Sequence, residues 1–141
     1  MKPCTSGTCG AAAYLIGGGC SDDSFMDFRA GLIALGHDWY QRAAACPDAL
    51  AAHPAVNNTR APCGEDIFDE KVNYAAPRAF QHVTGEEETF YHAFDAYRAS
   101  HGKPEQGDAD MGEDFDFDDP DEMQRRLPRL IALYLGHSVA K

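Results

Sequence analysis

The chain has few positive charges and no long apolar run. Its 12 Lys and Arg residues stand against 23 Asp and Glu residues, which gives a formal net charge of −11. Nucleic acids and anionic membranes are themselves negatively charged, so this balance argues against both as direct partners. No segment approaches the ~18 consecutive apolar residues of a membrane-spanning helix. We therefore expect no nucleic-acid partner and no membrane contact.

An export signal is not predicted either. The apolar run after Lys2 is short, and Gly17 stands three residues before Cys20, where a lipoprotein signal has Leu. The cysteine count is odd, so the thiols cannot all pair with one another; they are Cys4, Cys9, Cys20, Cys46 and Cys63. Without a secretory signal we interpret them as reduced thiols and predict a cytoplasmic location.

The sequence also lacks alternating β-patterns and internal repeats, whereas apolar residues recur at helical spacing. One face is formed by residues three or four apart, which predicts a single long helix over about 22–45; these residues are Phe25, Phe28, Leu32, Leu35 and Trp39. A C-terminal helix is predicted over about 120–136. Asp119 and Pro120 mark its start, and Pro128 should kink or restart it. The predicted class is all-α, a small irregular helical bundle built around the long helix.

Other segments complete this prediction. Shorter helices are expected over 47–52, 65–83 and 89–99, and 53–63 is expected to be a loop. Residues 1–10 are small and polar, and we expect them to be poorly ordered. Residues 11–141 are expected to form a single helical domain, with an acidic connector at about 101–119. A chain of 141 residues with 44% hydrophobic residues is long enough for one core.

The turn before the long helix is the most specific local pattern. Three glycines, Gly17–Gly19, precede Cys20 and then the segment Ser21–Asp23. Ser21 or Asp22 can accept a hydrogen bond from the free N–H groups of the first helical turn. The acidic side chains also suit the positive end of the helix dipole. Helix capping alone therefore explains these residues.

The segment 11–43 resembles the bacterial domain-of-unknown-function family numbered 4240. The residues that carry this resemblance are Ala12-Ala13-Tyr14, the turn from Gly18 to Asp23, Phe25 and Phe28-Arg29. Similar residues continue along the chain to about position 136; they are Tyr74, Ala76, Ala79 and Phe80, and then Arg126 to Leu130. The resemblance implies no activity.

The chain departs from this family in two places. Relatives carry more helical sequence ahead of Ala12, so this chain looks N-terminally short, and they have a large residue where Gly31 stands. Both differences remove apolar bulk. We therefore expect the face around Phe28 and Trp39 to be partly uncovered and two copies of the chain to pair through it.

Several residues are candidates for chemistry. A thiol at a helix N-terminus can have a lowered pKa, which makes Cys20 a candidate nucleophile. Asp22, Asp23 and Arg29 complete the candidate catalytic set.

Metal-binding patterns are incomplete. The pair His37-Asp38 is similar to the His-Asp pair of metal-dependent phosphohydrolases, and it would need further ligands such as His53, His82 or His92. The set Cys4, Cys9 and Cys20 lacks the second pair that a structural zinc site uses. The acidic run Asp108–Glu122 does not fit an EF-hand loop. We expect no metal and no cofactor.

Two functions remain open. The first is a binding or interaction module whose partner is another protein or a second copy of the chain. The alternative is an enzyme, hydrolase-like and possibly metal-dependent, with its site at the Cys20–Asp23 turn. An enzyme would need a concave pocket in which the candidate side chains converge.

Overall fold

Helices are the regular elements of the computed structural model, which describes residues 7–57, 67–86, 89–102 and 115–135. No strand occurs in these ranges, which confirms the predicted all-α class. In chain order, with η for 3-10 helices, the elements are α1 (Gly7–Gly17), α2 (Asp22–Ala34), α3 (His37–Ala45), η1 (Pro47–Ala52), α4 (Pro54–Asn57), η3 (Glu70–Tyr74), α5 (Ala75–Thr84), α6 (Phe90–His101), α7 (Pro120–Arg126) and α8 (Pro128–Tyr134).

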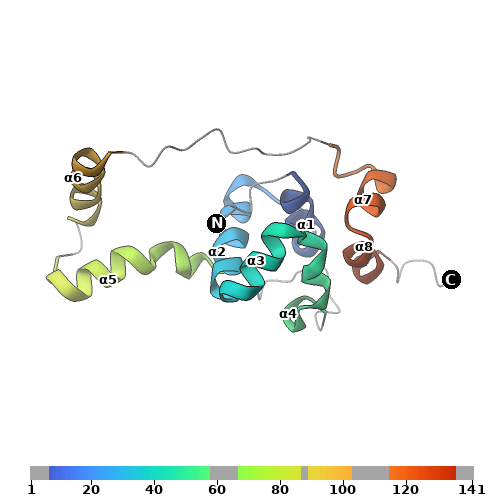
Figure 1. Ribbon diagram of the computed structural model, residues 1–141, viewed down its shortest axis with the longest axis horizontal. Coiled ribbons are helices and arrows are strands. Elements are labelled where there is room, and N and C mark those ends of the chain that lie inside the picture. The colour runs from blue at the N-terminus through green and yellow to red at the C-terminus, as the bar shows by residue number, and fades with distance from the viewer. Residues whose placement is uncertain (1–6, 58–66, 87–88, 103–114, 136–141) are drawn as a thin grey trace.

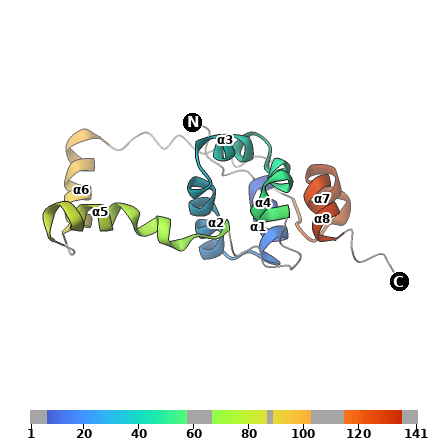
Figure 2. The same cartoon turned by 90° about the horizontal axis from the view of Figure 1, so that it is seen from below.

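The molecule consists of a central body and an arm. The body is built from α1–α4, with α7 and α8 at one end, whereas α5 and α6 extend from the other end (Figures 1 and 2). Helix α1 contacts α2, η1 and α8 and so lies inside the body. Its sequence is apolar all round, as a buried helix requires. We use the name arm for α5 and α6 together.

The core follows from this arrangement. Small alanines on α1 let neighbouring helices approach closely, and larger side chains fill the remaining space. The largest buried side chains are Phe28, Ile16, Leu32, Leu50, Ile67, Leu127 and Leu130. The face of α2 that was expected to be partly uncovered is therefore closed at Phe28 and Leu32 by the chain's own helices. That expectation was wrong at these two positions, while Trp39 is half-buried and lies against His53.

The predicted long helix over about 22–45 is two helices. Helix α2 ends at Ala34 and α3 begins at His37, because Gly36 has a φ of 93° and interrupts the helical conformation. A residue with a side chain rarely adopts this conformation, so glycine favours the break. The Gly36 N–H donates to the Ile33 carbonyl and closes the last turn of α2. The apolar residues keep their helical spacing across this break, so the spacing alone could not predict it.

The C-terminal helix predicted over about 120–136 consists of α7 and α8, with Leu127 between them, so the restart predicted at Pro128 is confirmed. Asp119 caps α7 as expected, since its Oδ1 accepts from the Asp121 N–H at 2.9 Å. Pro128 restarts the chain as α8, which has no capping side chain at its own N-cap, Leu127.

The acceptor for α8 comes from a distant element. Asp48 on η1 is buried, and its Oδ1 accepts from the Arg129 and Leu130 N–H groups at 3.0 Å each. This buried carboxylate therefore serves to hold η1 against the start of α8.

Gly31 brings α2 against the chain after residue 66. A Cβ at this position would lie 1.8 Å from the Ile67 carbonyl oxygen, so no side chain fits. Next to it the Asp69 N–H donates to the Asp27 carbonyl at 3.1 Å. The expectation that Gly31 leaves the core short of apolar bulk was therefore wrong, because the space is filled by backbone.

Several predicted boundaries shift. Helix α1 begins at Gly7, within the segment 1–10 that was expected to be poorly ordered, and Cys9 is fully buried in it; residues 1–6 lie outside the described ranges. The predicted loop 53–63 contains helix α4. Residues 103–114 of the acidic connector are not described, but Phe115 and Phe117, near its end, pack against the core. The expected helix over 89–99 is confirmed as α6.

One cysteine differs from the expectation of reduced thiols. Cys9 is disulfide-bonded. Cys20 and Cys46 are free, as predicted.

Candidate functional site

The Cys20–Asp23 turn caps α2. Gly18 and Gly19 have φ values of 67° and 133° and reverse the chain after α1. Ser21 is the N-cap, and its Oγ accepts from the Ser24 N–H at 3.2 Å. The side chains of Asp22 and Asp23 are exposed in the first helical turn, where the positive end of the helix dipole stabilises their negative charges.

The Cys20 thiol has the opposite electrostatics from an activated nucleophile. Its Sγ donates to the Ser21 carbonyl oxygen at 3.5 Å. Burial raises the pKa of the thiol above its ordinary value, and the charge of Asp22 raises it further. The thiolate, which is the nucleophilic form, is therefore disfavoured at neutral pH.

Arg29 lies apart from this turn. It follows Asp22 by seven residues on α2, a separation of about 10 Å along the axis. There it lines a shallow hollow of about 240 Å³ together with Met26, Ile33 and Tyr40. The structure thus places Cys20 and Asp22 together but does not bring Arg29 into a common pocket with them.

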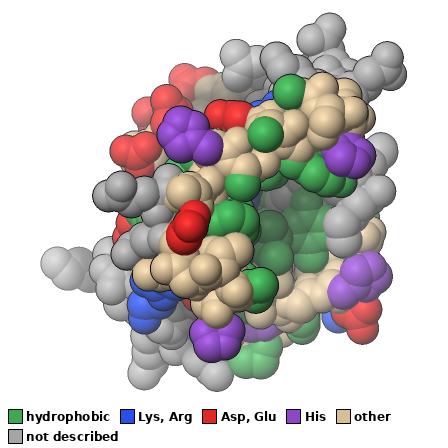
Figure 3. Space-filling view, turned by 90° about the vertical axis from the view of Figure 1, so that its left-hand side faces the viewer, with side chains coloured by type: hydrophobic (Ala, Val, Ile, Leu, Met, Phe, Trp, Pro, Cys, Tyr) green, Lys and Arg blue, Asp and Glu red, His purple; other side chains and the backbone are tan. Residues whose placement is uncertain are grey.

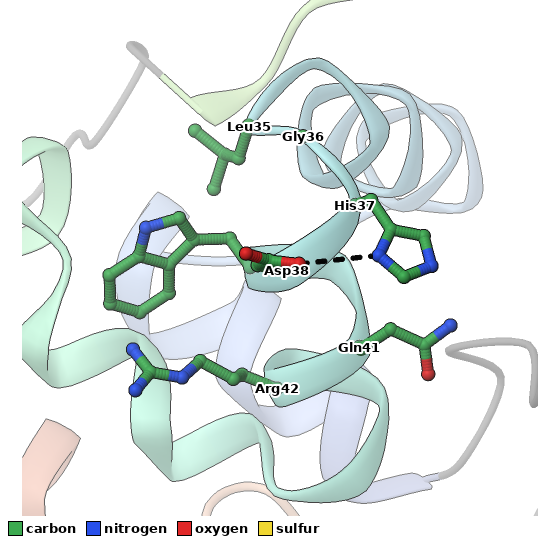
Figure 4. Close-up of a pocket in the computed structure, with 7 residues that line it drawn as sticks. Leu35, Gly36, His37, Asp38, Gln41 and Arg42 are labelled. Carbon is green, nitrogen blue, oxygen red and sulfur yellow. Dashed lines mark hydrogen bonds and ion pairs between the residues drawn. The ribbon is translucent and has the colours of Figure 1, made fainter.

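A wider depression surrounds the His37-Asp38 pair at the start of α3 (Figure 4). The two side chains point toward each other, and His37 Nδ1 lies 3.3 Å from Asp38 Oδ1. Both are largely exposed. Across the depression the Arg42 guanidinium lies 5.0 Å from the centre of the Trp39 ring.

The further ligands that this pair would need do not converge on it. The Nδ1 atom of His53 accepts from the Ala55 N–H at 3.1 Å, and burial lowers the pKa of this histidine. His82 and His92 lie on α5 and α6, in the arm. Within the described ranges, no group of three or more His, Cys, Asp or Glu side chains is placed to hold a metal ion.

Four of the eight large hydrophobic side chains that are exposed in the described residues lie on the arm. Neither α5 nor α6 has a buried residue. Val83, Tyr91, Phe94 and Tyr97 are between 46% and 83% exposed. Figure 3 faces this end of the molecule and shows hydrophobic side chains gathered around and inside a hollow, with histidines at its rim.

Contacts between aromatic rings connect α5 and α6 within the arm. Phe80 on α5 lies 5.7 Å from Phe90 on α6, and the Phe90 ring stacks on that of Phe94 at 5.8 Å. The Arg98 guanidinium lies 5.6 Å from the centre of the Phe94 ring. The sequence predicted a helix over 89–99 but did not identify its aromatic residues Phe90, Phe94 and Tyr97 as a site. Their spacing was visible, but it could not show that no other element covers them.

These features define a small all-helical protein with an exposed aromatic arm. The chain belongs to the family described as "Protein of unknown function (DUF4240)", whose profile matches residues 1–82, more than half of its length. The match covers the body through α4 and most of α5, while α6, α7 and α8 lie beyond it. Searches of curated proteins and of solved structures found no match. None of the helices described is both long and apolar enough to cross a membrane.

Proposed function

We propose that this protein is an interaction module and that the arm is its binding surface. The observation that carries the proposal is the absence of any buried residue in α5 and α6. Isolated helices of 10 and 12 residues are marginal in water, and most helix stability in proteins comes from packing of an apolar face. A partner that covers the arm supplies this packing.

The composition of the arm supports the same proposal. Aromatic residues are enriched at the centres of protein interfaces because they bury a large area with few rotatable bonds. Tyr91, Phe94 and Tyr97 offer such rings on one helix, and Arg98 lies next to them.

The enzyme alternative has less support. The Ser21 side chain is engaged in capping, and burial raises the pKa of Cys20. The alternative stays a prediction, and the reactivity of Cys20 tests it, as described in the Discussion.

Site-specific photo-crosslinking tests the module. A benzophenone amino acid is placed at Tyr91 on the arm or, as a control, at Leu135 after α8, at the opposite end of the molecule (Figure 1). Irradiation in living cells of the source organism should give a defined crosslinked product from position 91 and none from position 135. Mass spectrometry then identifies the partner. The absence of a product specific to position 91 would contradict the proposal.

We also propose a location in the bacterial cytoplasm. The acidic composition and the free thiols of Cys20 and Cys46 support it. The disulfide at Cys9 argues the other way, because the cytosol keeps most thiols reduced. Trapping thiols with an alkylating reagent at the moment of cell lysis tests the proposal. The proposal expects this disulfide to be reduced in the cell: a Cys9 that is alkylated at lysis supports the cytoplasm, and a Cys9 in a disulfide at that moment contradicts it.

A further inference from the structure

Helix α6 carries aromatic rings at the spacing of a coiled-coil seam. Phe90, Phe94, Tyr97 and His101 are separated by four, three and four residues, which are the d and a positions of a heptad pattern. Consecutive rings lie against each other, with 5.8 Å between Phe90 and Phe94 and 4.1 Å between Tyr97 and His101. The seam therefore runs along one side of the whole helix.

Helix α5 covers only the beginning of this seam in the described structure. It contacts the seam at Phe90 through Phe80. Further along, Phe94 and Tyr97 are 46% and 59% exposed. In coiled coils, a seam with this spacing packs against a second helix. We therefore expect the element that covers Phe94 and Tyr97 to be a helix.

The distribution of charge favours α6 of a second copy of the chain as the helix that packs on the seam. The chain has a net charge of −11, and two such chains repel each other through most of their surfaces. The helices of the arm lack this excess of acid, since α5 and α6 carry Arg78 and Arg98 against the single acid Asp95. Two copies can approach through the arm without bringing acidic side chains together.

We propose that α6 pairs with α6 of a second copy in antiparallel orientation, a proposal that rests on the arm being the binding surface. In an antiparallel pair, a positions face d positions. Phe94 then packs against Tyr97 of the partner subunit, and the two-fold axis repeats this contact. Antiparallel packing also directs the two acidic bodies to opposite ends of the pair, whereas parallel packing would bring them side by side.

The size of the contact predicts a reversible dimer. Each aromatic side chain buries about 150–250 Å² when fully covered, and Tyr91, Phe94 and Tyr97 are already about half-covered. They contribute roughly 300 Å² per copy, well below the ~800 Å² per partner of a standard stable interface. We therefore expect the dimer to dissociate on dilution.

Sedimentation velocity over a dilution series tests this pairing. The wild-type chain should shift from the single to the double chain mass as its concentration rises. Tyr97→Asp and Phe94→Lys should each remain at the single mass. The control matched to Tyr97→Asp is His92→Asp, which places the same negative charge on an exposed residue of α6 outside the seam and should dimerise like the wild type. Circular dichroism confirms that each variant keeps its helix content.

Mixing the two seam variants tests the orientation. In an antiparallel pair, Lys at position 94 of one chain faces Asp at position 97 of the other, and the second layer keeps the native Phe94 and Tyr97. An equimolar mixture of Phe94→Lys and Tyr97→Asp should therefore recover the double mass. A mixture that stays at the single mass overturns the antiparallel pairing.

The crosslinking experiment separates this inference from the proposed function. A wild-type chain that stays monomeric while Tyr91 crosslinks to a different protein overturns self-pairing and leaves the module intact. A product of twice the chain mass supports both. If the chain is monomeric and position 91 yields no crosslinked product, the results contradict both the self-pairing and the proposed interaction module.

Discussion

Gly31 determines how closely α2 approaches the segment that begins at Ile67. Glycine in a helix costs about 1 kcal/mol relative to alanine, so helix propensity alone favours alanine here. Tertiary contact reverses this preference, because the new Cβ would lie 1.8 Å from a backbone oxygen that cannot rotate away. The net effect of a substitution is therefore set by the neighbour and not by the helix.

We predict that Gly31→Ala lowers the free energy of unfolding by about 1–3 kcal/mol, the usual range for overpacking. Urea unfolding followed by the fluorescence of Trp39, the one tryptophan, measures the change. Met26→Ala on an exposed position of α2 is the control and should stay within about 0.5 kcal/mol of the wild type. A Gly31→Ala protein as stable as this control would show that the segment can move away.

Cys20 is the residue that tests the enzyme alternative. Burial and, to a smaller extent, the Asp22 carboxylate raise the pKa of its thiol above the ordinary value of a cysteine. We predict that iodoacetamide alkylation of Cys20 in the folded protein, followed by mass spectrometry, has its midpoint at a higher pH than alkylation of the same cysteine in the unfolded chain. Asp22→Asn should lower this midpoint, because it removes one of the two causes. A midpoint below neutral pH would instead favour a nucleophilic cysteine and the hydrolase-like reading.

Helix α8 depends on an acceptor from another element. The Asp48 carboxylate accepts from the N–H groups of Arg129 and Leu130, and Leu130 is fully buried. Because Pro128 opens the helix and Leu127 offers no polar side chain, the first turn would otherwise leave these donors without a capping side chain. Helix α2 contrasts with this, since Ser21 caps it from within the same turn.

We predict that Asp48→Ala lowers the free energy of unfolding by about 1–3 kcal/mol, the cost of leaving buried donors unsatisfied. Asp48→Asn keeps one acceptor oxygen and should lose less. Asp38→Ala removes an exposed acid from the first turn of α3 and serves as the control, with a change within about 0.5 kcal/mol. Chemical unfolding of all four proteins gives the comparison. Equal stability of Asp48→Ala and Asp38→Ala would contradict the role of the long-range cap.

The body and the arm differ in what stabilises them. The body surrounds α1 with α2, η1 and α8 and buries Phe28, Leu50 and Leu130 among others. The arm buries no residue. Regions with few buried apolar contacts open locally at low free energy, so stability is expected to be uneven along the chain.

We predict that amide hydrogens of α5 and α6 exchange with solvent much faster than those of α1 at concentrations where the chain is monomeric. Their opening free energy should lie near zero, whereas that of α1 should approach the free energy of global unfolding. Hydrogen exchange resolved by mass spectrometry measures both in one sample. Protection of α5 and α6 equal to that of α1 in the monomer would show that the arm is stable without a partner.

Features that depend on residues close together in the sequence could be predicted from the sequence. The all-α class followed from apolar spacing, the cap at Ser21 from the turn that precedes α2, and the start of α7 from Asp119 and Pro120. The family followed from the motif around Gly18–Arg29. In each case the interacting groups lie within one or two helical turns, where local backbone geometry decides the outcome.

Other features were decided only by tertiary structure. The break at Gly36 was hidden because the apolar spacing of α2 continues across it. The cap of α8 by Asp48 joins residues 81 positions apart, and no local pattern encodes such a contact. The exposure of Phe94 and Tyr97 could not be predicted either, since a helix face reads the same whether or not another element covers it. The sequence by itself determined which faces are apolar, and only the packing of the helices decided that the face of α2 is closed and that of α6 is open.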